Sequence, residues 1–324
     1  MELTQIGALA MNRRHFFIHR SRDVRLNGYC WMPEKPNQAK AVIQIAHGMA
    51  EHILRYEQFA EYLTTQGYIV YGHDHRGHGG SVMAPDDWGF FADSNGFEKV
   101  VEDMHMISEK IQKQYPELPL FLFGHSMGSF LTRRYIQLYK NISGVILSGT
   151  GGSQGLIGKA GKLIAAIEAR RIGRRTPSKL MNTLTFGDFN KAFQPARTAF
   201  DFLTRDEQAV DLYIKDKYCG FICSAQFYKD LLYGIEIIHR PKEVAHINHD
   251  LPIYLIAGTN DPVGNHGKGV KQVYEQYLAA GIHNVSLSLY QDARHELLSE
   301  LNKQEVYTDV SNWLEMILSS KSIS

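Results

Sequence analysis

The chain has 324 residues, which allows two domains or one large α/β domain with an insertion, and its composition is that of an ordinary globular protein. Its 35 lysines and arginines balance 34 aspartates and glutamates, which excludes a basic nucleic-acid-binding surface spread over the whole molecule. No apolar run reaches the roughly 18 to 20 residues that span a bilayer, Glu2 stands where a signal peptide carries positive charge, and three cysteines are too few for a disulfide framework. We therefore expect a soluble, cytoplasmic protein.

Short β-rich apolar runs alternate along the chain with segments of helical spacing. The first two runs are expected to pair antiparallel at a sheet edge, and most later runs are continuously apolar, as in parallel strands buried on both faces. Between them, Tyr56, Phe59 and Leu63 share one helix face and Gly67 is placed to end that helix, with further helices predicted around 97–111 and 270–277. The pattern predicts an α/β fold with a mostly parallel eight-stranded sheet and helices on both faces. The expected strands are 15–20, 26–32, 41–46, 68–72, 118–123, 144–149, 253–258 and 285–290.

A long insertion separates the sixth and seventh predicted strands. It spans roughly a hundred residues, whereas a parallel crossover needs only about a dozen. A segment of this length must have structure of its own, and we expect a helical cap of residues 151–250 over a core of residues 1–150 and 251–324. Within it, the basic amphipathic stretch 156–179 either docks on an anionic membrane surface or is a helix with one core face and one solvated face. The aromatic residues that follow either line an acyl pocket or form the cap's own small core.

The sequence from Gly124 to Gly128 reads Gly-His-Ser-Met-Gly and lies between a predicted strand and a predicted helix. This is the context of a nucleophile elbow, in which a tight turn exposes the serine hydroxyl above the sheet, at a helix amino terminus that favours negative charge. Side chains at the two glycine positions would collide with neighbouring backbone. Ser126 is therefore predicted to be a nucleophile, the alternative being an ordinary glycine-rich turn.

A serine hydroxyl needs a base to take its proton and an acid to orient that base. On a fold with a nucleophile elbow, the acid and then the histidine follow the serine, each in a loop after a strand. Asp261 follows the strand at 253–258 and His295 follows the strand at 285–290, so we predict a triad of Ser126, His295 and Asp261. The alternatives are Asp292 for the acid and His266 or His283 for the base.

The tetrahedral intermediate of acyl transfer also needs two N–H donors. One is predicted to be the backbone N–H of Met127, directly after the nucleophile. The other is assigned to the backbone N–H of Met49, in the loop after the strand at 41–46, where Gly48 allows close approach of the backbone. Losing one such donor typically costs about 3 kcal/mol of transition-state stabilisation.

Several motifs together resemble the monoacylglycerol lipase and lysophospholipase group of serine α/β-hydrolases. They are the run 47–52 (HGMAEH), the pair Arg55 and Tyr56, the run 74–79 followed by Ser81, and the elbow around Ser126. The similarity covers the core, including Asp261 and His295, and is weaker over the cap; Gly80 is an added small residue before Ser81. The resemblance implies an α/β-hydrolase fold with a cap after the sixth strand, esters of single-chain lipids as substrates, and no metal.

Other features have competing interpretations. Residues 73–78 carry three histidines but have Gly77 where a metallo-β-lactamase motif has aspartate, which favours a surface loop with structural hydrogen bonds over a metal site. Cys219 and Cys223 are spaced to share a helix face, and we interpret them as structural or incidental thiols. Glu51 and Arg55 are interpreted as an i,i+4 ion pair.

Two functions are compatible with these observations. The first is a cytoplasmic serine esterase that cleaves monoacylglycerol- or lysophospholipid-like esters through an acyl-enzyme, with no cofactor and no nucleic-acid partner. Whether its cap contacts a membrane or lipid surface peripherally depends on which interpretation of the stretch 156–179 holds. The second is a non-catalytic ligand-binding protein on the same fold. Among enzymes, cleavage of an amide, thioester or C–C bond is a further alternative, and the sequence leaves acyl length, headgroup and oligomeric state open.

Overall fold

The computed structural model describes residues 6–9, 13–21 and 23–321. Residues 1–5 and 10–12 lie outside the described residues. They belong to the amino-terminal segment for which the sequence analysis predicts that there is no signal peptide. The strands are β1 (Ile6–Leu9), β2 (Arg13–Ser21), β3 (Val24–Trp31), β4 (Ala41–Ala46), β5 (Tyr68–His73), β6 (Leu120–His125), β7 (Gly144–Ser148), β8 (Ile253–Gly258) and β9 (Val285–Tyr290).

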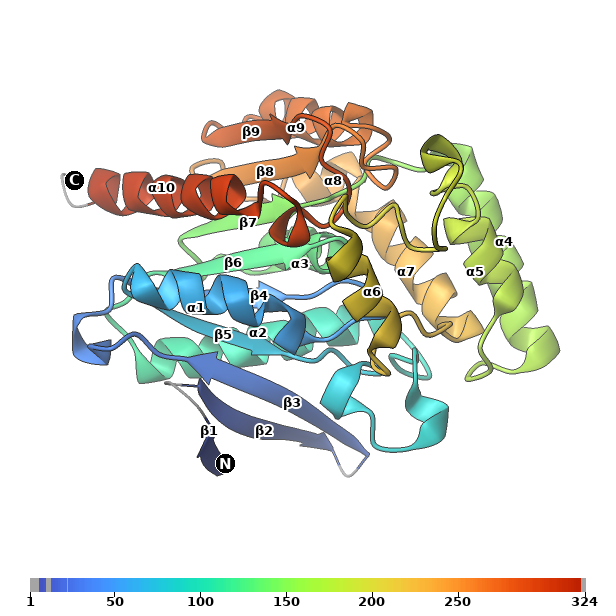
Figure 1. Ribbon diagram of the computed structural model, residues 1–324, viewed down its shortest axis with the longest axis horizontal. Coiled ribbons are helices and arrows are strands. Elements are labelled where there is room, and N and C mark those ends of the chain that lie inside the picture. Colours follow the sequence, from blue (N-terminus) through green and yellow to red (C-terminus); the bar gives the residue numbers. More distant parts are fainter. Residues whose placement is uncertain (1–5, 10–12, 22, 322–324) are drawn as a thin grey trace.

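These strands form one sheet in the order β1-β2-β3-β5-β4-β6-β7-β8-β9 (Figure 1). The pairs β1–β2, β2–β3 and β3–β5 are antiparallel, and all the other neighbours are parallel. The predicted mostly parallel sheet is confirmed, since β2 to β9 correspond to the eight expected strands. Strand β1 is not among the eight expected strands and adds a ninth at the antiparallel edge, so the strand before Ser126 is the sixth in the chain rather than the fifth.

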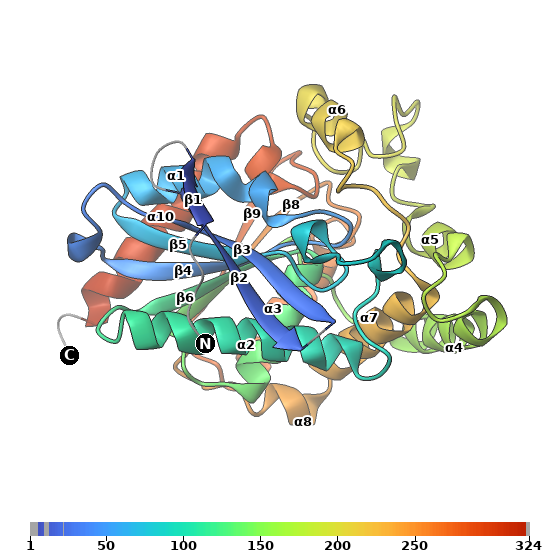
Figure 2. The same cartoon turned by 90° about the horizontal axis from the view of Figure 1, so that it is seen from below.

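Helices cover both faces of the sheet. Helices α1 (Glu57–Thr65) and α10 (Lys303–Lys321) lie on one face, and α2 (Gly96–Gln114), α3 (Met127–Leu138) and α9 (Lys268–Ala279) lie on the other (Figures 1 and 2). Strand β6 shows why its sequence is continuously apolar: Phe121 and Phe123 pack into the core on the α1 and α10 side, whereas Leu122 packs into the core on the α3 side. A parallel strand buried on both faces therefore has a nearly continuous run of apolar side chains.

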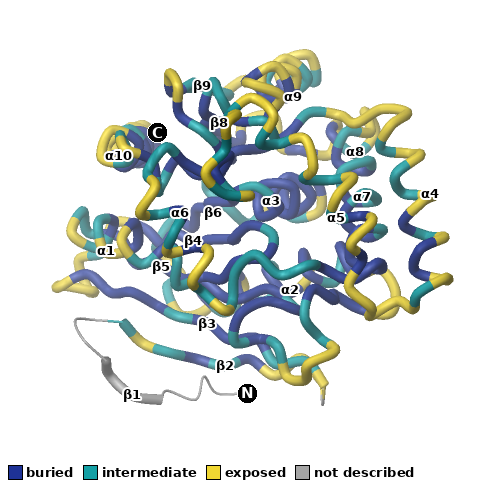
Figure 3. The backbone as a smooth tube through the Cα atoms, turned by 45° about the vertical axis from the view of Figure 1, so that its right-hand side comes forward, coloured by how far each residue is buried: buried dark blue, intermediate teal, exposed yellow. Residues whose placement is uncertain are grey.

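Five helices lie between β7 and β8, within residues 151–250, which we call the cap segment. They are α4 (Gly155–Ile172), α5 (Lys179–Phe186), α6 (Glu207–Lys215), α7 (Ala225–Ile238) and α8 (Pro241–Val244). Helix α4 packs along α7, which in turn contacts α3 of the core, and α4 to α7 gather at the carboxyl ends of the parallel strands (Figures 1 and 2). Figure 3 shows that the outer side of α4 is exposed.

Short 3-10 helices occupy several of the connections. They are η1 (Pro36–Gln38), η2 (Ile53–Tyr56), η3 (Gly79–Ser81), η4 (Pro85–Asp87), η5 (Lys191–Phe193) and η6 (Leu297–Ser299). Two of them, η2 and η6, follow the loops after β4 and β9, and these loops carry the predicted site residues Met49 and His295. The site is therefore built from loops at one end of a rigid sheet, the place where open α/β sheets bind their ligands.

Candidate active site

Ser126 occupies the sharp turn between β6 and α3. Its backbone has φ 53° and ψ −120°, a strained conformation for a residue with a side chain. The turn closes so tightly that a Cβ on Gly124 would lie 2.5 Å from the Gly128 carbonyl oxygen, and a Cβ on Gly128 would lie 2.0 Å from the Ala46 carbonyl oxygen. Both glycines are therefore required by the geometry, as the sequence predicted, and the strain holds the Ser126 hydroxyl above the sheet edge.

The structure brings the three predicted triad residues into one hydrogen-bonded line. His295 Nε2 lies 2.8 Å from Ser126 Oγ, and His295 Nδ1 lies 3.0 Å from Asp261 Oδ1. Asp261 and His295 are buried, and Ser126 is half-buried. The residues meet because β6, β7, β8 and β9 are consecutive parallel neighbours whose carboxyl ends lie at the same edge of the sheet. The loops also pack closely, since a Cβ on Gly258 would lie 2.0 Å from the Ala293 carbonyl oxygen.

The alternative residues lie outside this line. Asp292, His266 and His283 are all exposed to solvent. Asp292 accepts a hydrogen bond from the Gln291 side chain at 2.8 Å, whereas the carboxylate hydrogen-bonded to the imidazole of His295 is that of Asp261. Position within the strand-to-helix loops, rather than residue type, therefore distinguishes the residues that converge from those that do not.

The charges around His295 favour a proton acceptor that works near neutral pH. Burial opposes the charged imidazolium, but Asp261, and after it Glu296 and Glu51, raise the pKa of His295 above its ordinary value. The ring of His125 lies 4.8 Å from that of His295, and burial together with the charge on His295 lowers the pKa of His125 to about 3. His125 is therefore neutral when His295 carries the proton, so the pair avoids two adjacent positive charges.

The backbone groups predicted to bind an oxyanion lie beside Ser126. A Cβ on Gly48 would come within 3.3 Å of the Ser126 Cβ, and Met49 and Met127 line the same cavity as Ser126. Within the described part of the chain, no protein acceptor is found for the N–H of Met49 or of Met127. Both donors are thus available to a substrate oxygen.

The loop that carries Met49 is held in place by Glu51, which belongs to the loop itself, and by residues of the cap segment. The Gly48 N–H donates to Glu51 Oε1 at 2.5 Å. Ala50, at φ 52°, presents a carbonyl oxygen that accepts from the Tyr213 hydroxyl at 3.0 Å and from the Gly220 N–H at 2.9 Å. Because Tyr213 and Gly220 belong to the cap segment, the position of this loop depends on the position of the cap.

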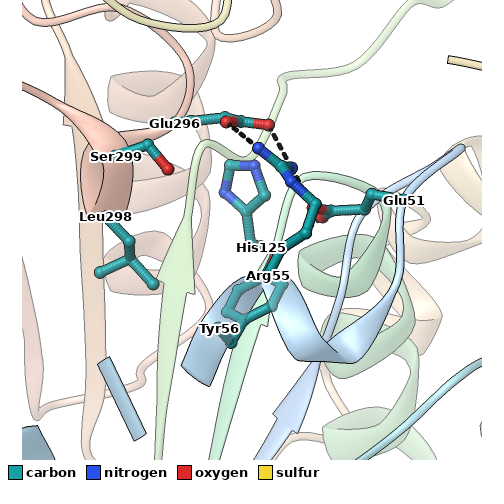
Figure 4. A pocket seen from close by; sticks show the side chains of 7 residues that line it. All are labelled: Glu51, Arg55, Tyr56, His125, Glu296, Leu298 and Ser299. Atoms are coloured by element: carbon teal, nitrogen blue, oxygen red, sulfur yellow. Dashed lines mark hydrogen bonds and ion pairs between the residues drawn. The ribbon is translucent and has the colours of Figure 1, made fainter. Parts of the chain in front are cut away.

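A buried ion network connects this loop to the loop of His295 (Figure 4). Arg55 donates two hydrogen bonds of 2.7 Å to the Glu296 carboxylate and also pairs with Glu51, which accepts a 2.8 Å hydrogen bond from the Tyr56 hydroxyl. The Glu51–Arg55 pair was predicted, but Glu296 was missed. Burial would raise the pKa of Glu296, yet Arg55 holds it below its ordinary value, so the carboxylate stays charged. The one feature of the sequence that could have pointed to Glu296 is its position directly after His295, the candidate base.

The triad opens onto a large and mainly apolar cavity. Its volume is about 1040 Å³, and the cap segment supplies much of its wall. The cap aromatics serve both purposes considered from the sequence, because Phe202 and Tyr213 pack into a small cluster of their own and also line the cavity. Other apolar lining residues are Phe130, Phe186, Phe221, Leu231 and Ile235.

Two expectations about side features were wrong. The loop 73–78 is buried rather than on the surface: His73, His75 and His78 are inaccessible, and burial lowers the pKa of His73 to about 4. Arg76 there binds the Asp103 carboxylate at 2.5 and 2.9 Å.

The other wrong expectation concerns the cysteines. Cys219 and Cys223 lie in the non-helical connection between α6 and α7, so they do not share a helix face.

Gly80, the residue added before Ser81, is held in place by a hydrogen bond: its N–H donates to Asp74 Oδ2 at 2.7 Å.

The parallel sheet, the strained serine after β6 and the hydrogen-bonded histidine and aspartate define a serine hydrolase of the α/β-hydrolase fold. Residues 37–302 match the family described as serine aminopeptidase, S33, and the chain belongs to this family. The chain is 27% identical to rat monoglyceride lipase over 292 residues, covering 88% of this chain and 84% of that one. It is 25% identical to the monoacylglycerol lipase of Mycolicibacterium smegmatis over 295 residues, covering 90% and 93%.

Solved structures agree with the sequence comparisons. A thermostable carboxyl esterase from Bacillus coagulans superposes with a TM-score of 0.87 at 25% identity, covering 95% of this chain and all of that one. The predicted resemblance to the monoacylglycerol lipase group is confirmed, and the chain is a serine carboxylic ester hydrolase. Among the described residues, no helix has the length and apolar content needed to cross a bilayer.

Proposed function

We propose that Ser126, His295 and Asp261 hydrolyse esters of single-chain lipids, of the monoacylglycerol or lysophospholipid type. The observation that carries this proposal is the 2.8 Å contact between His295 Nε2 and Ser126 Oγ beside an apolar cavity of about 1040 Å³. Such a cavity exceeds what a short acid needs and suits an acyl chain. The names of the relatives support a glycerol ester, and the Bacillus coagulans esterase was solved in complex with glycerol.

The chemistry follows from the geometry. Ser126 Oγ attacks the ester carbonyl carbon while His295 Nε2 accepts the hydroxyl proton, and the Met49 and Met127 N–H groups stabilise the oxyanion. Asp261 holds Nδ1–H of the imidazole and stabilises the imidazolium. His295 then gives its proton to the departing alkoxide oxygen, which leaves an acyl-enzyme. A water molecule, deprotonated by His295, releases the carboxylic acid and restores Ser126.

We also propose that residues 151–250 act as a cap whose outer face contacts lipid. Leu156 and Ile157 on α4 are each 81% exposed, and Ile157 also lines the cavity. Part of the basic charge is neutralised within the protein, because Lys162 pairs with Glu236 and Arg175 pairs with Asp87. Apolar contact by Leu156 and Ile157 adds to the charge that remains unpaired, and it places the cavity next to the lipid from which a substrate would enter.

A substrate panel tests the function. We expect saturated monoacylglycerols and lysophospholipids to be cleaved at rates that rise with acyl length until the cavity is filled, and aminoacyl p-nitroanilides to be cleaved poorly. The oriented imidazole favours this hydrolase over a purely ligand-binding protein, which needs no base. Efficient cleavage of the anilides with inert lipid esters would overturn the proposal in favour of an amide substrate.

A further inference from the structure

Three metal-ligating side chains meet where the cap segment touches the loop after β4. His52 Nε2 lies 2.7 Å from Asp216 Oδ2, and Cys219 Sγ completes a set whose ligand atoms all lie within 4.8 Å of one another. Across 6–9, 13–21 and 23–321, no other group of three His, Cys, Asp or Glu side chains has this spacing. His52 is buried and the other two are half-buried, so the group is protected but reachable from solvent.

The donor atoms suit zinc. Zn²⁺ binds imidazole nitrogen, carboxylate oxygen and thiolate sulfur at about 2.0 to 2.3 Å in a tetrahedron, which sets the ligand atoms about 3.3 to 3.8 Å apart. His52 Nε2 and Asp216 Oδ2, now 2.7 Å apart, must therefore separate by roughly 0.6 Å, and Cys219 Sγ, which lies within 4.8 Å of both, must come to about 3.5 Å from each. Mg²⁺ and Ca²⁺ are poor candidates because they prefer oxygen ligands only. The half-exposed Asp216 leaves the fourth position open to water.

The surrounding charges favour a cation. Arg55 exerts the largest single charge effect on the Cys219 thiol, but Glu51 and Glu296 act in the opposite sense, as does Asp216, which is itself one of the three ligands. Arg55 is itself engaged by Glu296 through two hydrogen bonds. Binding of Zn²⁺ would release the Cys219 thiol proton to solvent and replace the hydrogen bond between His52 and Asp216 with two metal bonds.

The position of the group gives it a consequence for catalysis. His52 lies three residues after Met49, the proposed oxyanion donor, and Gly220, next to Cys219, donates its N–H to the Ala50 carbonyl at 2.9 Å. We propose that His52, Asp216 and Cys219 bind Zn²⁺, and that the bound ion inhibits ester hydrolysis by shifting the loop of Met49 against the cap. A displacement of about 1 Å at a catalytic group can lower the rate by roughly 10²-fold. The inhibitory part rests on the proposed function, whereas the metal site does not.

Binding is tested on the full-length, chelator-washed protein. Calorimetric titration with Zn²⁺ is expected to give one ion per chain, and Co²⁺ is expected to show the near-ultraviolet band of a thiolate ligand. Cys219→Ser should abolish the band and weaken Zn²⁺ binding at least about tenfold, since even outer partners of metal ligands matter by that much. Asp216→Asn should also weaken binding, whereas Cys223→Ser, at a buried thiol four positions away, should leave it unchanged. Absence of stoichiometric binding, or equal affinity in Cys219→Ser, overturns the site.

Inhibition is tested separately with a p-nitrophenyl ester. Added Zn²⁺ should lower turnover by the wild-type chain and by Cys223→Ser, but not by Cys219→Ser, whose thiol lies outside the substrate cavity. Stoichiometric binding without inhibition overturns the regulatory part and leaves the site standing. Lack of hydrolysis by the metal-free wild-type protein counts against the proposed function instead, and the Co²⁺ spectrum still decides the metal site.

Discussion

Arg55 makes two hydrogen bonds of 2.7 Å to Glu296, the residue that follows His295 in the chain. Arg55 comes from the helical turn after β4 and Glu296 from the loop after β9, so one guanidinium joins the loop of the proposed oxyanion donor to the loop of the proposed base (Figure 4). Both side chains are largely buried. A planar two-point contact of this kind fixes orientation as well as distance.

Replacing Arg55 with methionine is expected to lower the free energy of unfolding by about 3 to 5 kcal/mol, because Glu296 and Glu51 would remain buried without their partner. Chemical denaturation measures this loss. Arg197→Met is the matched control, since Arg197 pairs with Asp211 on the surface and exposed pairs contribute about 0 to 1 kcal/mol. Equal, small changes in both variants would show that the buried network does not hold the two loops.

Asp261 and Asp292 offer a direct comparison of two candidate acids. Asp261→Asn should lower kcat for ester hydrolysis by roughly 10³- to 10⁴-fold, because the imidazole loses the carboxylate that fixes its tautomer. Asp292 is exposed and directed toward Gln291, so Asp292→Asn should change kcat by less than about threefold, as for an ordinary surface substitution. The reverse ranking would assign the acid to Asp292.

The pH profile reports the environment of His295. The imidazole must be neutral to accept the serine proton, so kcat/KM falls as pH drops through its pKa, and the raised pKa sets the midpoint of that fall above about pH 6.5. Glu296→Gln removes a negative charge that raises this pKa and should move the midpoint to lower pH. Glu109→Gln, an exposed acid on α2, should leave the midpoint in place. An unchanged profile in Glu296→Gln would mean that Glu296 does not act on the base.

The apolar face of α4 predicts lipid contact. In sedimentation with phospholipid vesicles, Leu156→Ser combined with Ile157→Ser should reduce binding at least about tenfold, because each side chain of this size contributes about 1.5 to 3 kcal/mol when it leaves water. Leu301 is also exposed but lies outside the cap segment, so Leu301→Ser serves as the control. If all proteins sediment alike, the cap does not dock through this face.

The sequence predicted those features that depend on local pattern. Continuous apolar runs gave the strands, and glycines around Ser126 gave the elbow because each must avoid nearby backbone atoms. Asp261 and His295 could be chosen because the topology places loops after parallel strands at one edge. The alternatives Asp292 and His283 have the same residue types as Asp261 and His295 and lie in the same part of the chain. Only their position in the fold rules them out as members of the triad.

Features that depend on contacts between distant segments were missed. Glu296 was overlooked because its partner Arg55 lies 241 positions away. The grouping of His52 with Asp216 and Cys219 requires the cap to fold back on the loop after β4, and no spacing in the sequence indicates it. Residues 73–78 were assigned to a surface loop as the alternative to a metal site, whereas the fold buries the three histidines and pairs Arg76 with Asp103.

Covalent labelling with a fluorophosphonate, located by mass spectrometry, tests the central claim most directly. The label should be found on Ser126 of the wild-type protein in one copy per chain. It should be lost in Ser126→Ala and strongly slowed in His295→Ala, which removes the group that activates the hydroxyl. A wild-type chain that stays unlabelled, or one that carries the label on another serine, would contradict the account.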